Sequence, residues 1–306
     1  MQESMYRYMR VGILHFMAYP EVLKEEGSYL ETLQKIAEDD FFTAVEVCEV
    51  KDDRVKEKVK KLLKTAHLSV AYCAHPKILT RSLDLNSFSQ KERKKAVDQI
   101  KIAVDEAYEI GAEELIFLSG KDPGEERRDD ARRLLTFSIK DICAYAKSRG
   151  DLRITLEIFD REVEKRCLIG PADEARMVAE EVRREFDNFG LLVDLSHIPL
   201  LNETPAEAIL PVKDYLVHAH LGNCVLKDAQ HPAYGDSHPR FGIEGGENDV
   251  EEVVKFLEVL FEVGFLNEDN PPMVSFEIKP LADESAQVVI ANAKRVLREA
   301  WVRLNI

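Results

Sequence analysis

The stretches Ile154-Thr155-Leu156-Glu157 and Leu191-Leu192-Val193-Asp194 share a pattern, a mainly apolar run that ends in a carboxylate. Short β-rich runs of this kind recur at intervals of some tens of residues. They are residues 11–16, 44–48, 68–73, 114–118, 153–157, 189–194, 216–220 and 273–277. Because runs of this length and composition are typical of buried strands, we expect eight strands.

The segments between these runs carry helix signals. Ser89 with Glu92 forms a capping box that opens a helix running to about Ile110, and Gly111 ends it. Thr204-Pro205 is a second cap, followed by proline at the first helical position, and Asn248 with Glu251 is expected to open the helix before the eighth strand.

Strict alternation of strands and helices implies a parallel sheet covered by helices. Eight such units suit a closed barrel better than an open sheet, and the sequence has neither a G-x-G-x-x-G nor a P-loop motif. We therefore expect the α/β class, a (β/α)8 TIM barrel, as a single domain that spans residues 1–306.

The composition of the chain limits the classes of molecule that it is expected to bind. The net charge of −15 gives no general footprint for nucleic acid, and no stretch approaches the length of a membrane-spanning helix. The five cysteines are scattered and form no C-x-x-C pair, which argues against disulfides and thiolate zinc sites. We expect a cytoplasmic protein with a small-molecule partner, no nucleic acid and no membrane; a homo-oligomer stays open.

Four adjacent predicted strands end in polar side chains, Glu157, Asp194, His220 and Glu277. The carboxyl ends of barrel strands meet at one mouth, so these groups should converge there. Three carboxylates packed together would have to take up protons or bind a cation. The sequence thus predicts a divalent metal held by these four residues, with manganese, cobalt, zinc and magnesium all compatible. We expect His218 to point the other way, toward the helices.

A second set of polar residues follows strand three, strand six and strand seven. The long connection 221–248 after strand seven is rich in His, Asp, Gly and Pro, and loops of that length are usually functional. Its members could bind a second metal or the substrate, and the full set of candidates is His75, His197, Asp236, His238, Lys227 and Arg240.

Together these pieces resemble the xylose-isomerase-like barrel superfamily, which includes sugar phosphate isomerases and epimerases and endonuclease IV. The matching pieces are Glu157, Asp194-Leu195-Ser196-His197, His218-Ala219-His220, the stretch Asp236-Ser237-His238-Pro239-Arg240-Phe241-Gly242, and Glu277. The resemblance implies a metal-dependent sugar or sugar-phosphate isomerase or epimerase that acts through an enediolate. Glu157 and Glu277 would exchange protons with the substrate, and His197 would hydrogen-bond it.

Two other functions stay open. In endonuclease IV, a metal-dependent phosphodiesterase, the resemblance places zinc ligands at eight positions of this chain, His75, Glu157, Asp194, His197, His220, Asp236, His238 and Glu277. In strand four the family also uses a histidine just before a Pro-Gly, where this chain has Phe117-Leu118-Ser119-Gly120 and no imidazole. The third alternative is a barrel that kept the fold without catalysis.

Overall fold

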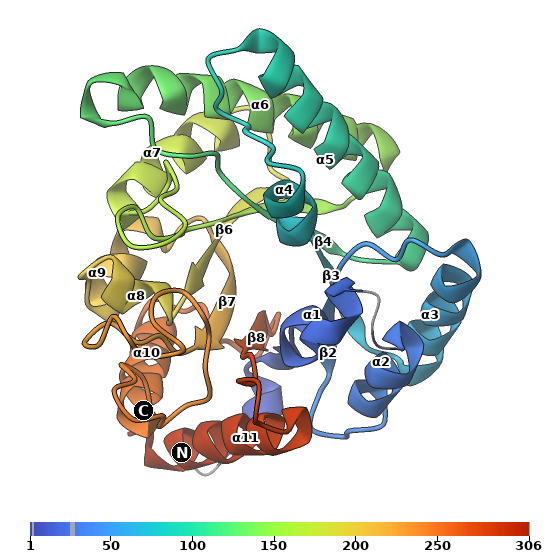
Figure 1. Ribbon diagram of the computed structural model, residues 1–306, viewed down its shortest axis with the longest axis vertical. Coiled ribbons are helices and arrows are strands. Elements are labelled where there is room, and N and C mark those ends of the chain that lie inside the picture. Colours follow the sequence, from blue (N-terminus) through green and yellow to red (C-terminus); the bar gives the residue numbers. More distant parts are fainter. Residues whose placement is uncertain (2, 25–27, 306) are drawn as a thin grey trace.

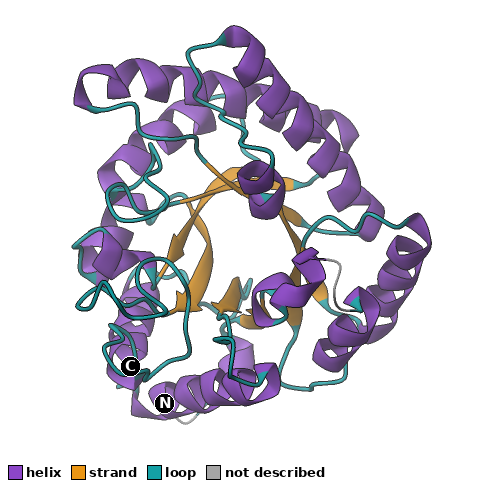
Figure 2. Cartoon of the chain, in the orientation of Figure 1, coloured by secondary structure: helices purple, strands orange, loops and turns teal. Residues whose placement is uncertain are grey.

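Eight parallel strands at the centre of the computed structural model are surrounded by helices, and the structure describes residues 1, 3–24 and 28–305 (Figure 2). The strands are β1 (Arg10–Ile13), β2 (Ala44–Val47), β3 (Ser69–Cys73), β4 (Glu114–Leu118), β5 (Arg153–Glu157), β6 (Phe189–Asp194), β7 (Leu216–Gly222) and β8 (Met273–Glu277). They pair in the order β1-β8-β7-β6-β5-β4-β3-β2. The predicted (β/α)8 barrel is therefore confirmed.

The first and second strands close the barrel without a regular ladder. Leu14 and Glu46 form an isolated parallel bridge, and the Thr43 backbone N–H donates to the Val11 carbonyl at 2.9 Å. Gly12 lies in this part of the barrel because a Cβ there would be 2.4 Å from Ser275 Oγ. A glycine thus lets β1 pack closely against β8.

Long helices cover the outside of the barrel, while the short helices α1 (His15–Ala18) and α4 (His75–Thr80), which follow β1 and β3, lie over its carboxyl end (Figure 1). The α-helices are α1 (His15–Ala18), α2 (Tyr29–Ala37), α3 (Asp53–Ala66), α4 (His75–Thr80), α5 (Gln90–Ile110), α6 (Arg128–Arg149), α7 (Ala172–Arg183), α8 (His197–Leu200), α9 (Pro205–Ile209), α10 (Val250–Glu262) and α11 (Ala286–Arg303). The 3-10 helices are η1 (Met5–Arg7), η2 (Pro20–Lys24), η3 (Glu125–Arg127) and η4 (Leu210–Val212).

Two of the three predicted helix starts are confirmed. Ser89 caps α5 by accepting from the Glu92 backbone N–H, and Thr204 forms a full capping box with Glu207 at α9. The third was wrong by one residue, because Asp249 with Glu252 caps α10. Asn248 is buried instead, and its amide donates to the carbonyls of Leu195 and Gly222. Asn248 therefore ties the end of the long seventh connection to two strand ends.

The strand boundaries agree with the sequence to within a few residues. The first run was predicted too long, since His15 and Phe16 already belong to α1, and β7 continues two residues past the predicted end. All five cysteines are buried and free. Within the described residues, no helix combines the length and apolar character needed to cross a membrane.

Candidate metal centre

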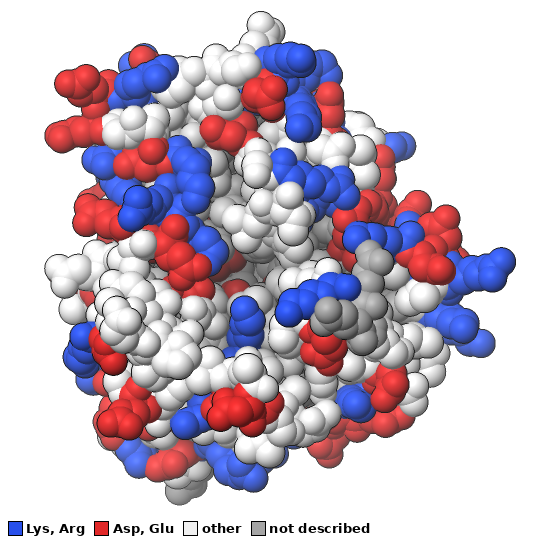
Figure 3. Space-filling model, viewed as in Figure 1, with Lys and Arg blue, Asp and Glu red and all other residues white. Residues whose placement is uncertain are grey.

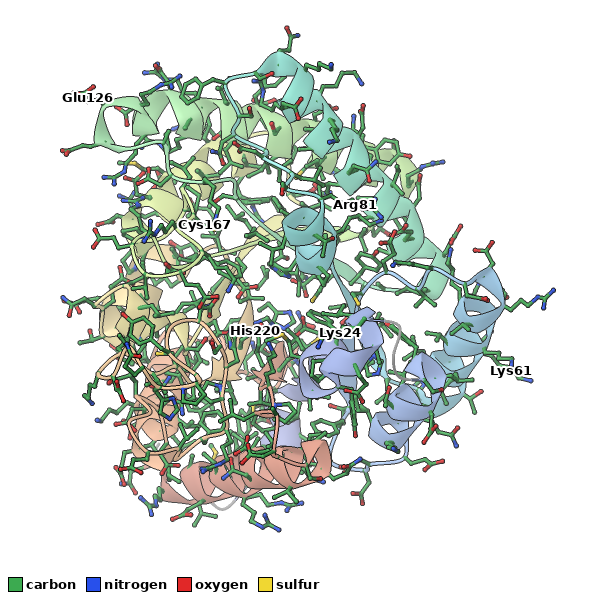
Figure 4. The ribbon with its side chains drawn as sticks, viewed as in Figure 1. Lys24, Lys61, Arg81, Glu126, Cys167 and His220 are labelled. Carbon is green, nitrogen blue, oxygen red and sulfur yellow. The ribbon has the colours of Figure 1, made fainter. Side chains whose placement is uncertain are left out.

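The four strand-end residues meet at the carboxyl mouth of the barrel. Glu157, Asp194, His220 and Glu277 each place one oxygen or nitrogen atom in a group whose atoms all lie within 4.8 Å of one another. All four side chains are buried. Figure 4 shows His220 near the middle of the ring of elements. We call these four residues the mouth cluster.

The His220 ring is oriented by contacts on both of its nitrogens. Its Nδ1 lies 2.8 Å from Glu277 Oε2, 3.5 Å from Asp194 Oδ2 and 3.6 Å from Glu157 Oε1. Its Nε2 lies 3.1 Å from Glu46 Oε1 on β2. A carboxylate on the far nitrogen of an imidazole fixes its tautomer and leaves the other nitrogen free to bind a cation.

Three atoms of the mouth cluster make no hydrogen bond although they are buried. They are Glu157 Oε1, Asp194 Oδ2 and His220 Nδ1, and they face one another. Buried polar atoms are otherwise almost always paired, so this convergence is the arrangement expected of ligands for a cation. Three carboxylates and one imidazole suit manganese, cobalt, zinc or magnesium. The residues present therefore fit a divalent metal.

The carboxylates of the mouth cluster have pKa values shifted in opposite directions. Burial alone would raise the pKa of Glu157, but the His220 and His75 imidazoles beside it hold that pKa at about 2. Burial also dominates at Glu277, where the nearby Glu157 charge adds to it and the pKa stays raised. Glu277 is therefore the carboxylate of this pair that takes a proton more readily.

His75, His197, Asp236 and His238 lie beside the mouth cluster. His75 Nε2 is 3.0 Å from Glu157 Oε2, and Asp236 Oδ1 lies 3.1 Å from His197 Nε2 and 2.8 Å from His238 Nε2. The long seventh connection folds over the mouth and buries Phe241. Asp194, His197 and His238 form a second group that could hold an ion.

Backbone features bring His238 into this position. His238 has φ 52°, in the left-handed region that non-glycine residues seldom adopt, and such conformations are often found at functional sites. Opposite it, a Cβ on Gly222 would lie 3.0 Å from His238 Nδ1 and 2.9 Å from the Glu277 carbonyl oxygen. Glycine at this strand end therefore allows the loop to approach β8.

Lys227 and Arg240, the predicted substrate-binding cations, lie outside this arrangement. The Lys227 side chain is 72% exposed and pairs with Glu247, and Arg240 pairs with Glu284. Neither lines the cavity at the mouth. Lys165 does approach the site, and its Nζ lies 2.9 Å from Asp236 Oδ2. No local sequence pattern indicates where these three side chains point, because all of them lie in irregular connections.

The prediction for His218 was wrong. Residues two apart in a strand share a face, so His218 points into the barrel beside His220. Its Nε2 lies 3.0 Å from Glu46 Oε1 and its Nδ1 lies 3.0 Å from Glu114 Oε2. Sequence reasoning also missed Glu46, although a charged residue within the apolar run of residues 44–47 was a readable signal. Phe159, which packs on His197 with ring centroids 4.4 Å apart, was missed as well.

The mouth opens into a cavity of about 730 Å³. Where the cavity meets the mouth cluster, its lining includes His75, Phe159, Asp236, His238 and Glu277. Figure 3 shows a hollow near the centre of this face, bordered by uncharged surface and by several lysine or arginine side chains. A cavity of this size lies within the range of small-molecule sites.

Comparison with known proteins shows to which family the chain belongs. Residues 33–284 match the family described as xylose isomerase-like TIM barrel. A D-tagatose 3-epimerase-like protein has a similar structure, with a TM-score of 0.71 at 21% identity over 96% of this chain and 99% of that one. The D-psicose 3-epimerase of Clostridium cellulolyticum H10, solved with D-tagatose, has a TM-score of 0.71 at 16% identity over 97% and 100%.

The IOLI protein, solved with a zinc atom, has a TM-score of 0.73 at 14% identity, covering 97% of this chain and 100% of its own. At these identities the structures show a shared fold. None of the curated proteins matches the sequence. On the strength of the match over residues 33–284, the chain belongs to the xylose isomerase-like TIM barrel family.

Proposed function

We propose that this protein is a divalent-metal-dependent isomerase or epimerase of a sugar or sugar phosphate. The observation that carries the proposal is the mouth cluster, where ligand atoms of four buried residues converge and those of Glu157, Asp194 and His220 make no hydrogen bond. These four residues would hold the metal. The similar structures of sugar 3-epimerases and of the zinc-bound IOLI protein support this choice.

The chemistry follows from the residues around the mouth. A divalent ion held there supplies Lewis-acid stabilisation of negative charge on nearby oxygens. Glu277, with its raised pKa, exchanges a proton with the substrate carbon next to a carbonyl, and Glu157 serves the other face. Deprotonation at that carbon gives an enediolate, and return of the proton from the opposite side inverts the centre.

Residues beside the two glutamates would position the substrate. His197 Nδ1 hydrogen-bonds the Ile158 carbonyl oxygen at 2.8 Å, which orients the ring and points Nε2 toward Asp236. Lys165 balances the Asp236 charge, and its pKa is raised because the carboxylates of Asp236 and Glu164 outweigh its burial. Both ring nitrogens of His197 are thus engaged, and His197 would act on the substrate through Asp236, which lines the cavity.

A second candidate is a phosphodiesterase similar to endonuclease IV. The observation in its favour is the group Asp194, His197 and His238, which could hold a second ion beside the mouth cluster. Against it, the end of β4 offers no imidazole, since its last residue, Leu118, is buried and apolar, and Ser119 Oγ accepts from the Ile169 backbone N–H. The isomerase proposal needs no third ion and is favoured.

The test is solvent deuterium incorporation into D-tagatose, D-psicose, D-fructose and ketose phosphates, measured with manganese, cobalt, zinc or magnesium. We expect exchange with at least one ketose and a loss of about 10²–10⁴ in rate for Glu157→Gln and for Glu277→Gln. Glu113→Gln, at an exposed position on the opposite end of the barrel, is the matched control.

Retention of the parental exchange rate by both glutamine variants would contradict the two-glutamate mechanism. Cleavage of abasic DNA without exchange into any sugar would replace it with the phosphodiesterase candidate.

A further inference from the structure

The cavity at the mouth has a second half that the proposed reaction does not use. Away from the mouth cluster it is lined by apolar side chains from the segments that follow β1, β2 and β3. We call this half the apolar annex; its apolar lining includes Phe16, Met17, Val22, Val50, Val55 and Leu79, and polar side chains such as those of Glu49, Lys51 and Asp52 border it. It is continuous with the half that holds His75, His238 and Glu277.

The size of the cavity exceeds that of a simple sugar. A six-carbon ketose has about twelve non-hydrogen atoms, and even at the roughly 30 Å³ that one water takes in the liquid it fills about half of the space. The cavity measures about 730 Å³. A sugar seated on the mouth cluster therefore leaves the annex to another part of the ligand.

The polar groups that border the annex already have partners. Tyr29 donates its hydroxyl to the Cys48 carbonyl oxygen at 3.2 Å, and Asp52 caps α3 by accepting from the backbone N–H groups of Arg54 and Val55. Lys77 is buried between Glu49, at 3.2 Å, and Glu106, at 2.6 Å. A sugar hydroxyl placed among these groups would compete with existing bonds, whereas an apolar group would not.

The rim of the annex also favours an apolar group of the ligand over a polar one. The Leu79 side chain on α4 lines the cavity, and the residue is 43% exposed. Exposed apolar residues that border a cavity are typical of a binding groove. Burial of Leu79, Met17 and Val55 by a ligand would remove apolar surface from water, which favours an apolar substituent over a polar one.

We propose that the substrate is a keto sugar carrying an aryl or alkyl substituent, such as a glycoside that also has a ketone, whose apolar group lies in the annex while its hydroxyl and carbonyl groups lie at the mouth cluster. The inference rests on the proposed function for the sugar end of the ligand. The annex itself is defined by the shape and chemistry of the cavity.

The experiment measures the binding of hexyl and methyl β-D-glucopyranoside to the manganese-loaded protein by calorimetry, below the micellar concentration of the hexyl compound. Both probes have the same sugar, and each buried methylene contributes up to about fourfold in affinity. We expect the hexyl compound to bind at least about tenfold more tightly. Leu79→Ser and Met17→Ser should each weaken hexyl binding several-fold and leave methyl binding unchanged.

Leu210→Ser is the control, because Leu210 is 44% exposed, close to the value for Leu79, and does not line the cavity. Equal affinity for the two probes, no measurable binding of either, or equal hexyl binding by Leu79→Ser, Met17→Ser and the parent would each overturn the inference. Ketose exchange without a hexyl preference would refute the annex alone. A hexyl preference that depends on Leu79, without exchange into any ketose, would refute the proposed reaction alone.

Discussion

Two buried groups of glutamate and histidine lie one above the other in this barrel, and they differ in how their polar atoms are paired. In the mouth cluster Glu157 Oε1, Asp194 Oδ2 and His220 Nδ1 make no hydrogen bond. Deeper in the barrel lies a second group, which we call the interior cluster, consisting of Glu46, Cys73, Glu114, Thr155, His218 and Ser275.

Every side-chain N, O and S atom of the interior cluster has a hydrogen-bond partner. Glu114 accepts from Thr155 and pairs with His218, whose other nitrogen faces Ser275 and Glu46. Glu46 pairs with His220 and accepts from the Cys73 thiol at 3.0 Å. Burial would raise the pKa of Glu46, but His220 and His218 hold it well below its ordinary range. Similar residues thus form a fully hydrogen-bonded network in the interior cluster, whereas in the mouth cluster they leave three buried atoms without a hydrogen bond.

The largest expected difference between the clusters is in the stability of the metal-free protein. Glu114→Ala leaves the buried His218 charge without one partner, and removing one member of a buried pair typically costs about 3–5 kcal/mol. Glu277→Gln removes a carboxylate whose raised pKa shows that its charge is unfavourable there, so it should cost little or stabilise. Urea unfolding after chelation measures both.

In the same experiment Glu113→Gln, beside Glu114 in the chain but exposed, should stay within about 0.5 kcal/mol of the parent. If Glu277→Gln proves more destabilising than Glu114→Ala, the structural role belongs to the mouth cluster and the proposed assignment is contradicted.

The next effect concerns the contact between the clusters. Glu46 fixes His220 through Nε2, so Glu46→Gln should weaken metal binding roughly 10–100-fold, as is usual for partners of metal-binding histidines. Competition against a chelator of known affinity measures this, again with Glu113→Gln as control. An unchanged affinity would mean that His220 does not depend on Glu46 for its orientation.

The smallest effect is a pH dependence of the metal-free protein. Burial would lower the pKa of His218, but Glu46 and Glu114 raise it to about 9. In the unfolded chain His218 loses its proton near its ordinary pKa of about 6.5, whereas in the folded state it keeps the proton up to about 9. The stabilisation that this proton contributes is therefore complete below about 6.5 and is lost as the pH rises through 9. His218→Gln should reduce the loss of stability between pH 6.5 and 8 by roughly 1–2 kcal/mol.

Urea unfolding at several pH values checks this, with His67→Asn, at an exposed helix end, as control. Metal affinity at the mouth should rise over the same range, because the ligands must lose protons before they bind. A His218→Gln variant with the parental pH profile would show that His218 carries no extra proton in the folded state.

Most of the fold could be predicted because each strand is a short, mainly apolar run and several helices, such as α5 and α9, begin at a capping residue. The convergence of Glu157, Asp194, His220 and Glu277 followed from barrel topology, which brings strand ends together whatever the loops do. The face of His218 was mispredicted only because the two-residue period of a strand was applied incorrectly.

Other parts of the site depend on contacts that no local pattern records. Glu46 and His220 are 174 residues apart in the sequence, and they meet only because β2 and β7 face the same barrel interior. Lys165 approaches Asp236 through an irregular connection, while Lys227 and Arg240 turn toward other acidic residues. Side-chain direction in such connections is set by tertiary packing, which the residue types alone do not specify.

The central claim is that the mouth cluster, and not the interior cluster, is the metal centre. Anomalous diffraction from crystals grown with manganese tests it most directly. We expect one peak among Glu157, Asp194, Glu277 and the Nδ1 atom of His220. A peak among Glu46, His218 and the Nε2 side of His220, which together also form a group that could hold an ion, would contradict the account. So would a fully occupied metal elsewhere in the protein with the four mouth residues apart.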